Sequence, residues 1–343
     1  MKEPLVSVII LNWNGERFLE NCLRSVLNQS YANVEIIVID NCSTDKSVDI
    51  LETKFPQLKL IKSDKNLGFA AGNNVGIRGS KGEYITLLNN DTEVESNWAE
   101  ALVKAGQAAP DIGMCACKVK FLQEKNTLNS TGVILYPDLT AINRGIGEKD
   151  IGQYDGSTSV FCPYGAAALY KKEMLDKIGL LDEDYFMFRE EDELGWRANL
   201  AGWRCIYVPT AVVYHYRSAA TKVGSPFKLY YGERNRLYTC FKYLPLAGLI
   251  ETLPATFRRY VFSSRASSSE DKLQISRLKL TWTLFEAYFD ACRRFFRMRR
   301  KGKEFLQQYK VSRKKVYQIL QTFPAKLSSL TGQLRGPANK GQK

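Results

Sequence analysis

The chain has 343 residues, of which 45% are hydrophobic and 12% aromatic, a composition that supports a folded core and excludes wholesale disorder. Its net charge of +13 is concentrated beyond residue 257, where 21 Lys and Arg residues accompany only 5 Asp and Glu residues. This asymmetry predicts contact between the C-terminal quarter and an anionic surface, either a membrane or a nucleic acid. We expect no transmembrane helix, and eight scattered cysteines indicate free thiols in a reducing cytosol.

Short strand and helix patterns alternate along the first hundred residues. Continuous apolar or β-branched runs predict strands at residues 6–11, 34–39, 58–62 and 84–88. Apolar residues at helical spacing predict helices at residues 17–28, 47–55 and 72–79. The first apolar run, VSVIIL, is interpreted as a strand rather than a signal peptide. The alternation predicts a doubly wound, mostly parallel sheet flanked by helices.

Polar residues follow each of these four strands. In chain order the motifs are Asn12-Trp13-Asn14-Gly15, Asp40-Asn41-Cys42-Ser43-Thr44-Asp45, Asp64-Lys65-Asn66-Leu67-Gly68-Phe69 and Asn89-Asn90-Asp91. Helix capping or turn formation explains any one of them. The carboxyl ends of parallel strands meet at one edge, where ligands bind, so four such motifs together favour a binding site.

An acidic cluster, Glu190-Glu191-Asp192-Glu193, opens a further predicted helix. The structural interpretation of this cluster is that acidic residues in the first turn of a helix interact favourably with the helix dipole. Four consecutive carboxylates exceed what a cap requires, and their repulsion should raise some pKa values, as in a general base. Two strands are expected to follow, at residues 204–208 and 211–216, and the second contains the only histidine, His215.

The C-terminal quarter contains a predicted amphipathic helix at residues 278–296. Its apolar positions recur at four-three spacing and are Leu278, Trp282, Phe285, Phe289, Cys292 and Phe296. The helix either packs on the preceding domain as an appendage or contacts an anionic membrane peripherally. Nucleic-acid binding is disfavoured because no nucleic-acid motif accompanies the basic residues.

Seven motifs, in their order and spacing, resemble glycosyltransferase family 2 of the GT-A fold, of the bacterial rhamnosyltransferase-like kind. They are VSVIILNWNG, VEIIVIDNCSTDKS, NLGFAAGNNVGI, GEYITLLNNDTEV, YGAAALYKKEMLDKIGLLDEDYF, EEDELGWRANLAGW and VVYHYRSAAT. The resemblance covers about residues 4–238. It implies a GT-A catalytic domain at residues 1–240. The pattern of the remaining residues predicts a basic helical appendage at 241–330 and a disordered tail at 331–343.

The resemblance also implies roles for residues at the sheet edge. The family's D-x-D metal motif corresponds to Asn89-Asn90-Asp91, so Asp91, together with His215, would hold Mg²⁺ or Mn²⁺. The alternative to metal binding by His215 is a purely structural role, because a lone histidine often has one. The residues implied in nucleotide binding are Asn12, Trp13, Asn14, Asp40, Asn66, Gly68, Asn73 and Asn90. For the glycines, turn geometry alone is an equal alternative.

The family pattern Glu-Asp-x-Asp-Leu-x-x-Arg places the catalytic base at Glu191, or at Asp192 if the chain bulges by one residue. The base would deprotonate an acceptor hydroxyl, which displaces the nucleoside diphosphate with inversion. The implied function is transfer of a rhamnose-like or hexose sugar from a nucleotide diphosphate sugar to a glycan or lipid-linked acceptor. The setting would be surface polysaccharide synthesis, in the cytoplasm or at the inner membrane face.

Two other classes of protein are alternatives to this enzyme. The missing first acid of the metal motif and the irregular acids at 190–193 leave room for an inactive nucleotide-sugar binder or scaffold. A dinucleotide-dependent oxidoreductase is disfavoured because no G-x-G-x-x-G motif follows the first strand.

Overall fold

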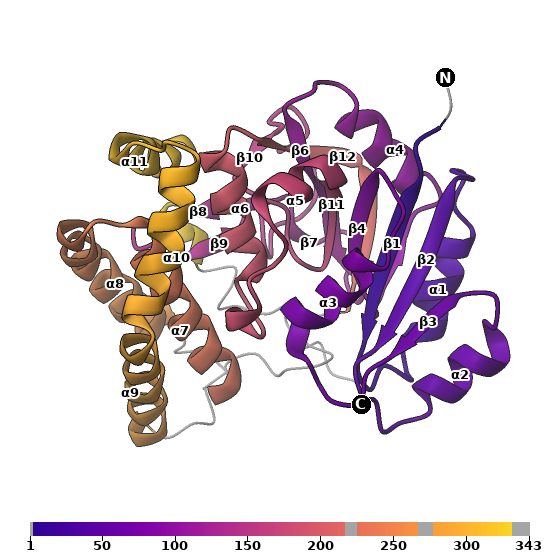
Figure 1. The fold of residues 1–343 in the computed structure, drawn as a ribbon, viewed down its shortest axis with the longest axis horizontal. Helices are drawn as coiled ribbons and strands as arrows, with labels where there is room; N and C mark the ends of the chain where they lie inside the picture. Colours follow the sequence, from indigo (N-terminus) through magenta and orange to yellow (C-terminus); the bar gives the residue numbers. More distant parts are fainter. Residues whose placement is uncertain (1–2, 217–224, 267–276, 331–343) are drawn as a thin grey trace.

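The computed structural model describes residues 3–216, 225–266 and 277–330. In this part of the chain the centre is a sheet of ten strands (Figure 1). Along its main path the strands lie in the order β10 (Ser159–Val160), β12 (Arg204–His215), β6 (Ile112–Phe121), β11 (Ala167–Lys171), β4 (Tyr84–Asn89), β1 (Val6–Asn12), β2 (Val34–Asp40) and β3 (Lys59–Lys62). Two short strands extend the sheet, namely β5 (Thr92–Val94) beside β12 and β7 (Leu128–Ser130) beside β6. Strands β1 to β4 run parallel, whereas β11 is antiparallel to β4 and to β6.

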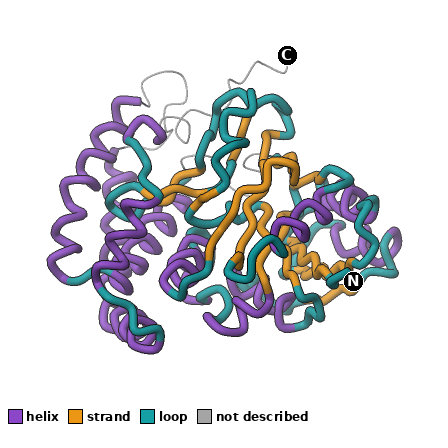
Figure 2. Tube along the Cα trace, turned by 90° about the horizontal axis from the view of Figure 1, so that it is seen from above, coloured by secondary structure: helices purple, strands orange, loops and turns teal. Residues whose placement is uncertain are grey.

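Helices cover both faces of the sheet (Figures 1 and 2). One face packs against α1 (Leu19–Leu27), α2 (Ser47–Lys54) and α4 (Trp98–Gly106). The other packs against α3 (Gly68–Arg78), α5 (Lys172–Ile178) and α6 (Glu190–Leu200). Side chains alternate along a strand, so Val8 and Ile10 of β1 join the first core and Ile9 joins the second. The predicted mostly parallel sheet with flanking helices is confirmed.

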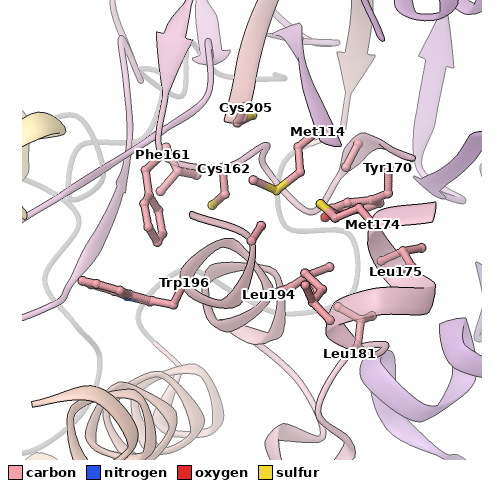
Figure 3. Close-up of a cluster of buried hydrophobic side chains, with 14 of the residues drawn as sticks. Met114, Phe161, Cys162, Tyr170, Met174, Leu175, Leu181, Leu194, Trp196 and Cys205 are labelled. Carbon is pink, nitrogen blue, oxygen red and sulfur yellow. The ribbon is translucent and has the colours of Figure 1, made fainter. Parts of the chain in front are cut away.

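The second core fixes the helix that carries the acidic cluster. Leu194 and Trp196 of α6 belong to the same buried cluster as Phe161, Cys162 and Met174 (Figure 3). Trp196 is fully buried and lies edge-on to Phe161, with ring centroids 5.3 Å apart. Burial of large side chains of this kind contributes about 1.5–3 kcal/mol each, which anchors α6 firmly.

The remaining helices gather at the end of the molecule remote from β3 (Figure 1). They are α7 (Pro226–Tyr243), α8 (Leu246–Ala266), α9 (Arg277–Arg293), α10 (Phe295–Gln308) and α11 (Arg313–Thr322). The smaller elements are the hairpin β8 (Val133–Leu135) and β9 (Ala141–Asn143) and the 3-10 turns η1 (Glu183–Tyr185) and η2 (Leu327–Ser329). Residue 240 lies inside α7, so a domain boundary there would divide a helix. The division into domains stays a prediction.

Three predicted elements differ from the structure. The strands expected at 204–208 and 211–216 form one strand, β12, whose register against β6 shifts between Val208 and Val212. The helix expected at 72–79 begins at Gly68, because the distant Phe186 carbonyl accepts the Phe69 and Ala70 N–H groups that would otherwise lack partners. The helix expected at 278–296 ends at Arg293, and a break at residue 294 redirects the chain into α10.

Other expectations concern membrane spans, cysteines and the tail. Within the described ranges, no helix combines the length and apolar character that crossing a bilayer requires. The eight cysteines are free thiols, and six of them are buried. The tail at 331–343, expected to be disordered, lies outside the described residues.

Candidate active site

The polar ends of three neighbouring strands meet at the carboxyl edge of the sheet. The Asn12 side-chain amide at the end of β1 donates to Asp40 Oδ1 at the end of β2, at 3.2 Å. Its oxygen accepts a hydrogen bond from Asn90 Nδ2, just beyond β4, at 2.8 Å. Asp40 is buried, so this carboxylate is held in one orientation. The predicted convergence of these strand ends is therefore present.

Ser43 and Gly15 belong to two of the strand-end motifs, and the sequence assigned neither a role of its own; both shape the hydrogen bonding around Asn12. Ser43 Oγ accepts hydrogen bonds from Asn12 Nδ2 at 3.1 Å and from the Asn14 backbone N–H at 2.9 Å. A Cβ atom at Gly15 would lie 2.1 Å from Asn90 Nδ2, so the Asn12–Asn90 contact requires glycine there. Trp13 is 41% exposed on the same loop and offers an aromatic face to a ligand.

The Asn66–Gly68 turn lies beside the end of β2 at the carboxyl edge of the sheet, where it contacts Asn41. Asn66 Oδ1 accepts hydrogen bonds from the Gly68 N–H at 2.8 Å and from Asn41 Nδ2 at 3.0 Å. Gly68 has a φ of +76°, and a Cβ there would lie 2.4 Å from the Phe186 ring, so the turn demands glycine. Asn73 is buried in α3 and donates to the Phe69 carbonyl at 2.9 Å. Its proposed contact with a nucleotide stays a prediction.

Asp91 and His215 lie side by side, because β5 pairs with the end of β12. Both are buried, and Asp91 Oδ1 is 3.4 Å from His215 Nε2. On the far side of the ring, Nδ1 lies 2.8 Å from the side-chain oxygen of Asn129 in β7. An amide oxygen can only accept a hydrogen bond, so Nδ1–H donates to it, and in the neutral ring Nε2 then presents its lone pair toward Asp91. A lone pair facing a carboxylate oxygen suits a cation between them.

The acidic cluster separates into groups with different surroundings. Glu193 points away from the edge and pairs with Arg197, at 2.8 Å. Asp192 faces Arg189 at 3.4 Å, and Glu190 is buried. Among the described residues, neither Oε2 of Glu190 nor Oε2 of Glu191 has a hydrogen-bond partner. Glu191 is the one acid of the four that is only half-buried.

The pKa values follow from these surroundings. Burial, together with the charge of Asp192, raises the pKa of Glu191 to about 7. Burial also raises the pKa of Asp192, although the Arg189 guanidinium acts against this shift. Burial opposes ionisation of Glu193 as well, but its positively charged neighbours hold its pKa below the ordinary value. Glu191 therefore has the pKa of a base poised near neutral pH.

Glu191 is connected to the Asp91–His215 pair through a short segment before β11. A Cβ at Gly165 would lie 2.7 Å from Glu191 Oε1, so the carboxylate rests against this backbone. The preceding residue, Tyr164, packs edge-on against the His215 ring at 5.8 Å. The candidate base and the candidate metal ligands therefore flank the same short stretch of chain.

The turn before Glu190 has an unusual backbone. Phe186, Phe188 and Arg189 all have positive φ values, of 62°, 68° and 70°. Left-handed conformations of non-glycine residues persist only where surrounding contacts enforce them. Here the buried Asn235 of α7 donates through Nδ2 to the carbonyls of Tyr185, Met187 and Phe188, at 2.9, 2.9 and 2.7 Å. No local sequence signal marks this asparagine.

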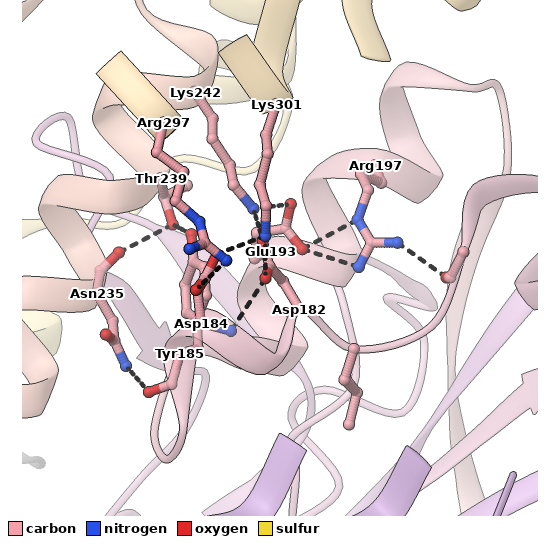
Figure 4. A network of polar contacts seen from close by, with 12 residues as sticks. Asp182, Asp184, Tyr185, Glu193, Arg197, Asn235, Thr239, Lys242, Arg297 and Lys301 are labelled. Carbon is pink, nitrogen blue, oxygen red and sulfur yellow. Dashed lines mark hydrogen bonds and ion pairs between the residues drawn. The ribbon is translucent and has the colours of Figure 1, made fainter. Parts of the chain in front are cut away.

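A polar network also ties α6 to the C-terminal helices (Figure 4). Glu193 Oε1 accepts from Lys242 Nζ at 2.8 Å and from the Tyr243 hydroxyl at 2.6 Å. Arg197 Nε donates to the other carboxylate oxygen at 2.9 Å. Lys242 and Glu193 are both buried, so α7 and α6 are joined by a buried ion pair. The C-terminal helices thus hold the helix that carries Glu191.

A family model described as "Glycosyl transferase family 2" matches residues 7–179. The chain belongs to glycosyltransferase family 2. An uncharacterized glycosyltransferase of Haemophilus influenzae is 40% identical over 103 residues, 29% of this chain and 41% of that protein. The O-antigen biosynthesis protein RfbC of Myxococcus xanthus is 25% identical over 233 residues, 65% of this chain and 18% of that protein. The family 2 chain therefore spans less than half the length of these relatives.

Solved structures share the GT-A fold of this family 2 glycosyltransferase. The mannosyltransferase PcManGT from Pyrobaculum calidifontis, in complex with GDP-Man and Mn²⁺, has a TM-score of 0.51 and 19% identity. The match covers 86% of this chain and 88% of PcManGT. The Staphylococcus aureus TarS 1–349 structure, in complex with UDP, has a TM-score of 0.52 at 17% identity. This match covers 93% of this chain and 91% of TarS 1–349. Similarity at this level of identity concerns the fold.

Proposed function

We propose that this family 2 glycosyltransferase is an inverting enzyme that moves a sugar from a nucleotide diphosphate sugar to an acceptor hydroxyl. The observation that carries the proposal is that Glu191 lies against Gly165 while the neighbouring Tyr164 packs on His215, whose other neighbour is Asp91. A base with a pKa near 7 and a candidate cation site then flank one reaction space.

The donor would bind at the strand ends. The proposed contacts come from Asn12, Trp13, Asn14, Asp40, Asn66, Gly68, Asn73 and Asn90. A buried carboxylate such as Asp40 suits hydrogen bonds from a base or ribose, and the exposed Trp13 suits stacking. Both solved neighbours were studied with guanosine or uridine diphosphate compounds, which supports a nucleotide diphosphate sugar as donor.

Asp91 and His215 would hold Mg²⁺ or Mn²⁺, completed by oxygens of the donor. Ions of this kind are commonly bound through one or two protein side chains plus substrate phosphates, so two side chains are sufficient. When bound, the ion would stabilise the charge that grows on the departing diphosphate. Asn129 would orient the imidazole through its contact with Nδ1.

Glu191 would remove the proton from the acceptor hydroxyl. The hydroxyl oxygen then bonds to the anomeric carbon while the bond from that carbon to the diphosphate oxygen breaks, and this single displacement inverts the configuration. Asp192 is the second candidate for the base, but its ion pair with Arg189 suits a supporting role better. The transferred sugar would be rhamnose-like or a hexose.

The acceptor would be a glycan or lipid-linked sugar in the synthesis of a cell-surface polysaccharide. The similarity to RfbC, named for O-antigen biosynthesis, supports this setting. The enzyme would then work in the cytoplasm, at the inner face of the membrane. Residues 1–240 would form the catalytic domain and 241–330 the helical appendage, with α7 shared between them.

An inactive nucleotide-sugar binder is the second candidate, because the metal motif retains one acid, Asp91. Separate Glu191→Gln and Asp192→Asn variants distinguish the two functions through the release of nucleoside diphosphate in the presence of acceptor. An enzyme with Glu191 as base should lose 100- to 10,000-fold in rate, on the order usual for a general base, with the first variant only. Equal rates in wild type and both variants would contradict the proposed base.

A further inference from the structure

The apolar stripe of α9 faces outward. Leu278, Trp282, Phe285 and Phe289, together with Phe296 at the start of α10, are between 54% and 84% exposed. These five residues are called the α9 face below. Surface helices of globular proteins normally turn such a stripe toward the core. A contiguous exposed aromatic surface of this kind marks an interaction site.

The opposite side of α9 explains why the α9 face cannot turn inward. Thr283, Ala287 and Ala291 are buried on that side, and α9 packs closely against α7 there. Small side chains let the two helices approach each other, whereas aromatic rings at these positions would separate them. Tyr288 adds a contact from its hydroxyl to buried Arg236 of α7, at 3.1 Å. The outward orientation is therefore built into the packing.

Helix α8 repeats the pattern. Leu246, Ile250, Leu253 and Phe257 have the same spacing as the first four residues of the α9 face and are 59–70% exposed. Its opposite side is polar, and Thr256 and Arg259 bind the buried carboxylate of Asp138. Both helices thus bury their polar or small side and expose their large apolar side.

Positive charge borders the α9 face. Arg293 and Arg300 are exposed on either side of Phe296 in the sequence, where α9 gives way to α10, and Arg300 lies 3.8 Å from the exposed Glu304. Arg294 and Arg297 are also exposed, but both pair with Asp184, at 2.9 and 2.8 Å. The chain from residue 258 onward contains 21 Lys and Arg against 5 Asp and Glu, a balance of +16. An exposed apolar stripe bordered by arginines is complementary to the surface of an anionic bilayer.

We infer that the α9 face docks on an anionic lipid surface, with its aromatic side chains in the interface and the arginines at the phosphates. A second copy of the chain is a poorer occupant, because a twofold interface would place the same arginines opposite one another. Lys242 and Lys301 tie α7 and α10 to α6 and η1, so docking would also fix the catalytic helix relative to the bilayer. The inference stands without the proposed transfer reaction, although a lipid-linked acceptor would benefit from it.

Co-sedimentation of the full-length protein with vesicles tests the inference, without donor or acceptor present. Vesicles of phosphatidylcholine alone are compared with vesicles of phosphatidylcholine mixed with anionic phosphatidylglycerol. One variant combines Phe285→Gln and Phe289→Gln, and a second combines Arg293→Gln and Arg300→Gln. The matched control is Ile151→Gln, which replaces an apolar side chain that is 82% exposed but lies far from α9 in sequence, in a loop before β10.

Wild type and the Ile151 control should bind the anionic vesicles and bind neutral vesicles weakly. The aromatic variant should bind the anionic vesicles at least about tenfold more weakly. The arginine variant should lose about 30-fold on anionic vesicles and little on neutral ones. Absence of wild-type binding to anionic vesicles, or unchanged binding of the aromatic variant, would overturn the inference. A wild-type dimer in sedimentation velocity that the aromatic variant dissociates would assign the face to a second copy instead.

Discussion

The side-chain amide of Asn235 donates to the carbonyl of Phe188 at 2.7 Å, two residues before the helix that carries Glu191 begins. The same amide also holds the carbonyls of Tyr185 and Met187. One buried residue of α7 thus fixes a turn with three left-handed residues. Because the Phe186 carbonyl of this turn also caps α3 at Phe69, the turn connects the donor side of the edge to the base.

Replacing Asn235 by leucine should therefore impair both stability and catalysis. The carbonyls of Met187 and Phe188 lose their donor, whereas the Tyr185 carbonyl keeps Arg234 Nη2 at 2.9 Å, and an unsatisfied group of this kind costs about 1–3 kcal/mol. We expect a lower melting temperature and a fall in kcat of at least about tenfold, because a base misplaced by 1 Å can lose about 100-fold. Thermal unfolding and steady-state kinetics measure the two effects.

Asn199 provides the matched control for this variant. Its amide also donates to two carbonyls, those of Phe161 and Gly195, but it lies at the other end of α6. Asn199→Leu should lower stability while kcat stays within about twofold of wild type at a temperature where both variants are folded. Equal kcat losses in the two variants would show that Asn235 acts through general stability alone.

The pH dependence of transfer should report the ionisation of Glu191. With its pKa near 7, the free base is present mainly above neutral pH. We expect kcat/KM to rise about tenfold per pH unit below about pH 7 and to level off above it. Initial rates from about pH 5.5 to about pH 8.5 measure this profile. A flat profile across that interval would exclude Glu191 as the titrating base.

Glu191→Gln should stabilise the fold at neutral and higher pH. A carboxyl whose pKa is raised in the folded state contributes stability below its unfolded pKa and loses it as pH rises through the folded value. The wild type should therefore weaken relative to the amide variant between about pH 4.5 and about pH 7, with no further change above. Melting temperatures of the two proteins at several pH values give this difference. A constant offset at all pH values would contradict the raised pKa.

Gly15→Ala should weaken donor binding. The new Cβ would enter the space of the Asn12–Asn90 hydrogen bond, so this contact must break or the loop must move. Gly156→Ala is the matched control, since a Cβ there meets nothing within 4 Å. We expect a weakening of nucleotide affinity of about tenfold for Gly15→Ala alone, measured by titration. Equal nucleotide affinities in both variants would show that the Asn12–Asn90 hydrogen bond plays no part in binding.

Lys242→Met should destabilise the protein by about 3 kcal/mol, because it leaves Glu193 buried with one cation fewer. The exposed Lys62–Glu52 pair offers the control, and Lys62→Met should cost less than about 1 kcal/mol. Chemical denaturation of both variants measures the two free energies of unfolding. A similar small loss in both would mean that the buried pair does not hold α7 to α6.

The sheet and its polar edge were predictable because their signals are local. Continuous apolar runs mark buried strands, and the residue after each run lies at the shared edge, as Asn12 and Asp40 do. Asp91 and His215 were singled out through family resemblance, and the β5–β12 pairing brings them together. The family pattern favoured Glu191 over Asp192 as the base, and the structure adds that Glu191 is less buried than the other three acids.

The residues that the sequence did not mark act through partners far away in the chain. Asn235 serves a turn in another part of the fold, and Asn129 serves a histidine in a neighbouring strand. Periodicity predicted the apolar stripe of α9 but not the side on which it lies, because a helical pattern does not say which face meets the protein. The early start of α3 likewise depends on the distant Phe186 carbonyl.

The most direct test of the proposed donor site is calorimetric titration of nucleotide diphosphate sugars, with and without Mn²⁺, into wild type and Asp91→Ala. We expect one donor to bind selectively, Mn²⁺ to strengthen its binding to wild type, and the Asp91 variant to lose that gain. Failure of every donor to bind a folded wild-type sample would contradict both the transferase and the inactive-binder functions. Equal gains from Mn²⁺ in both proteins would contradict the assignment of Asp91 to the metal.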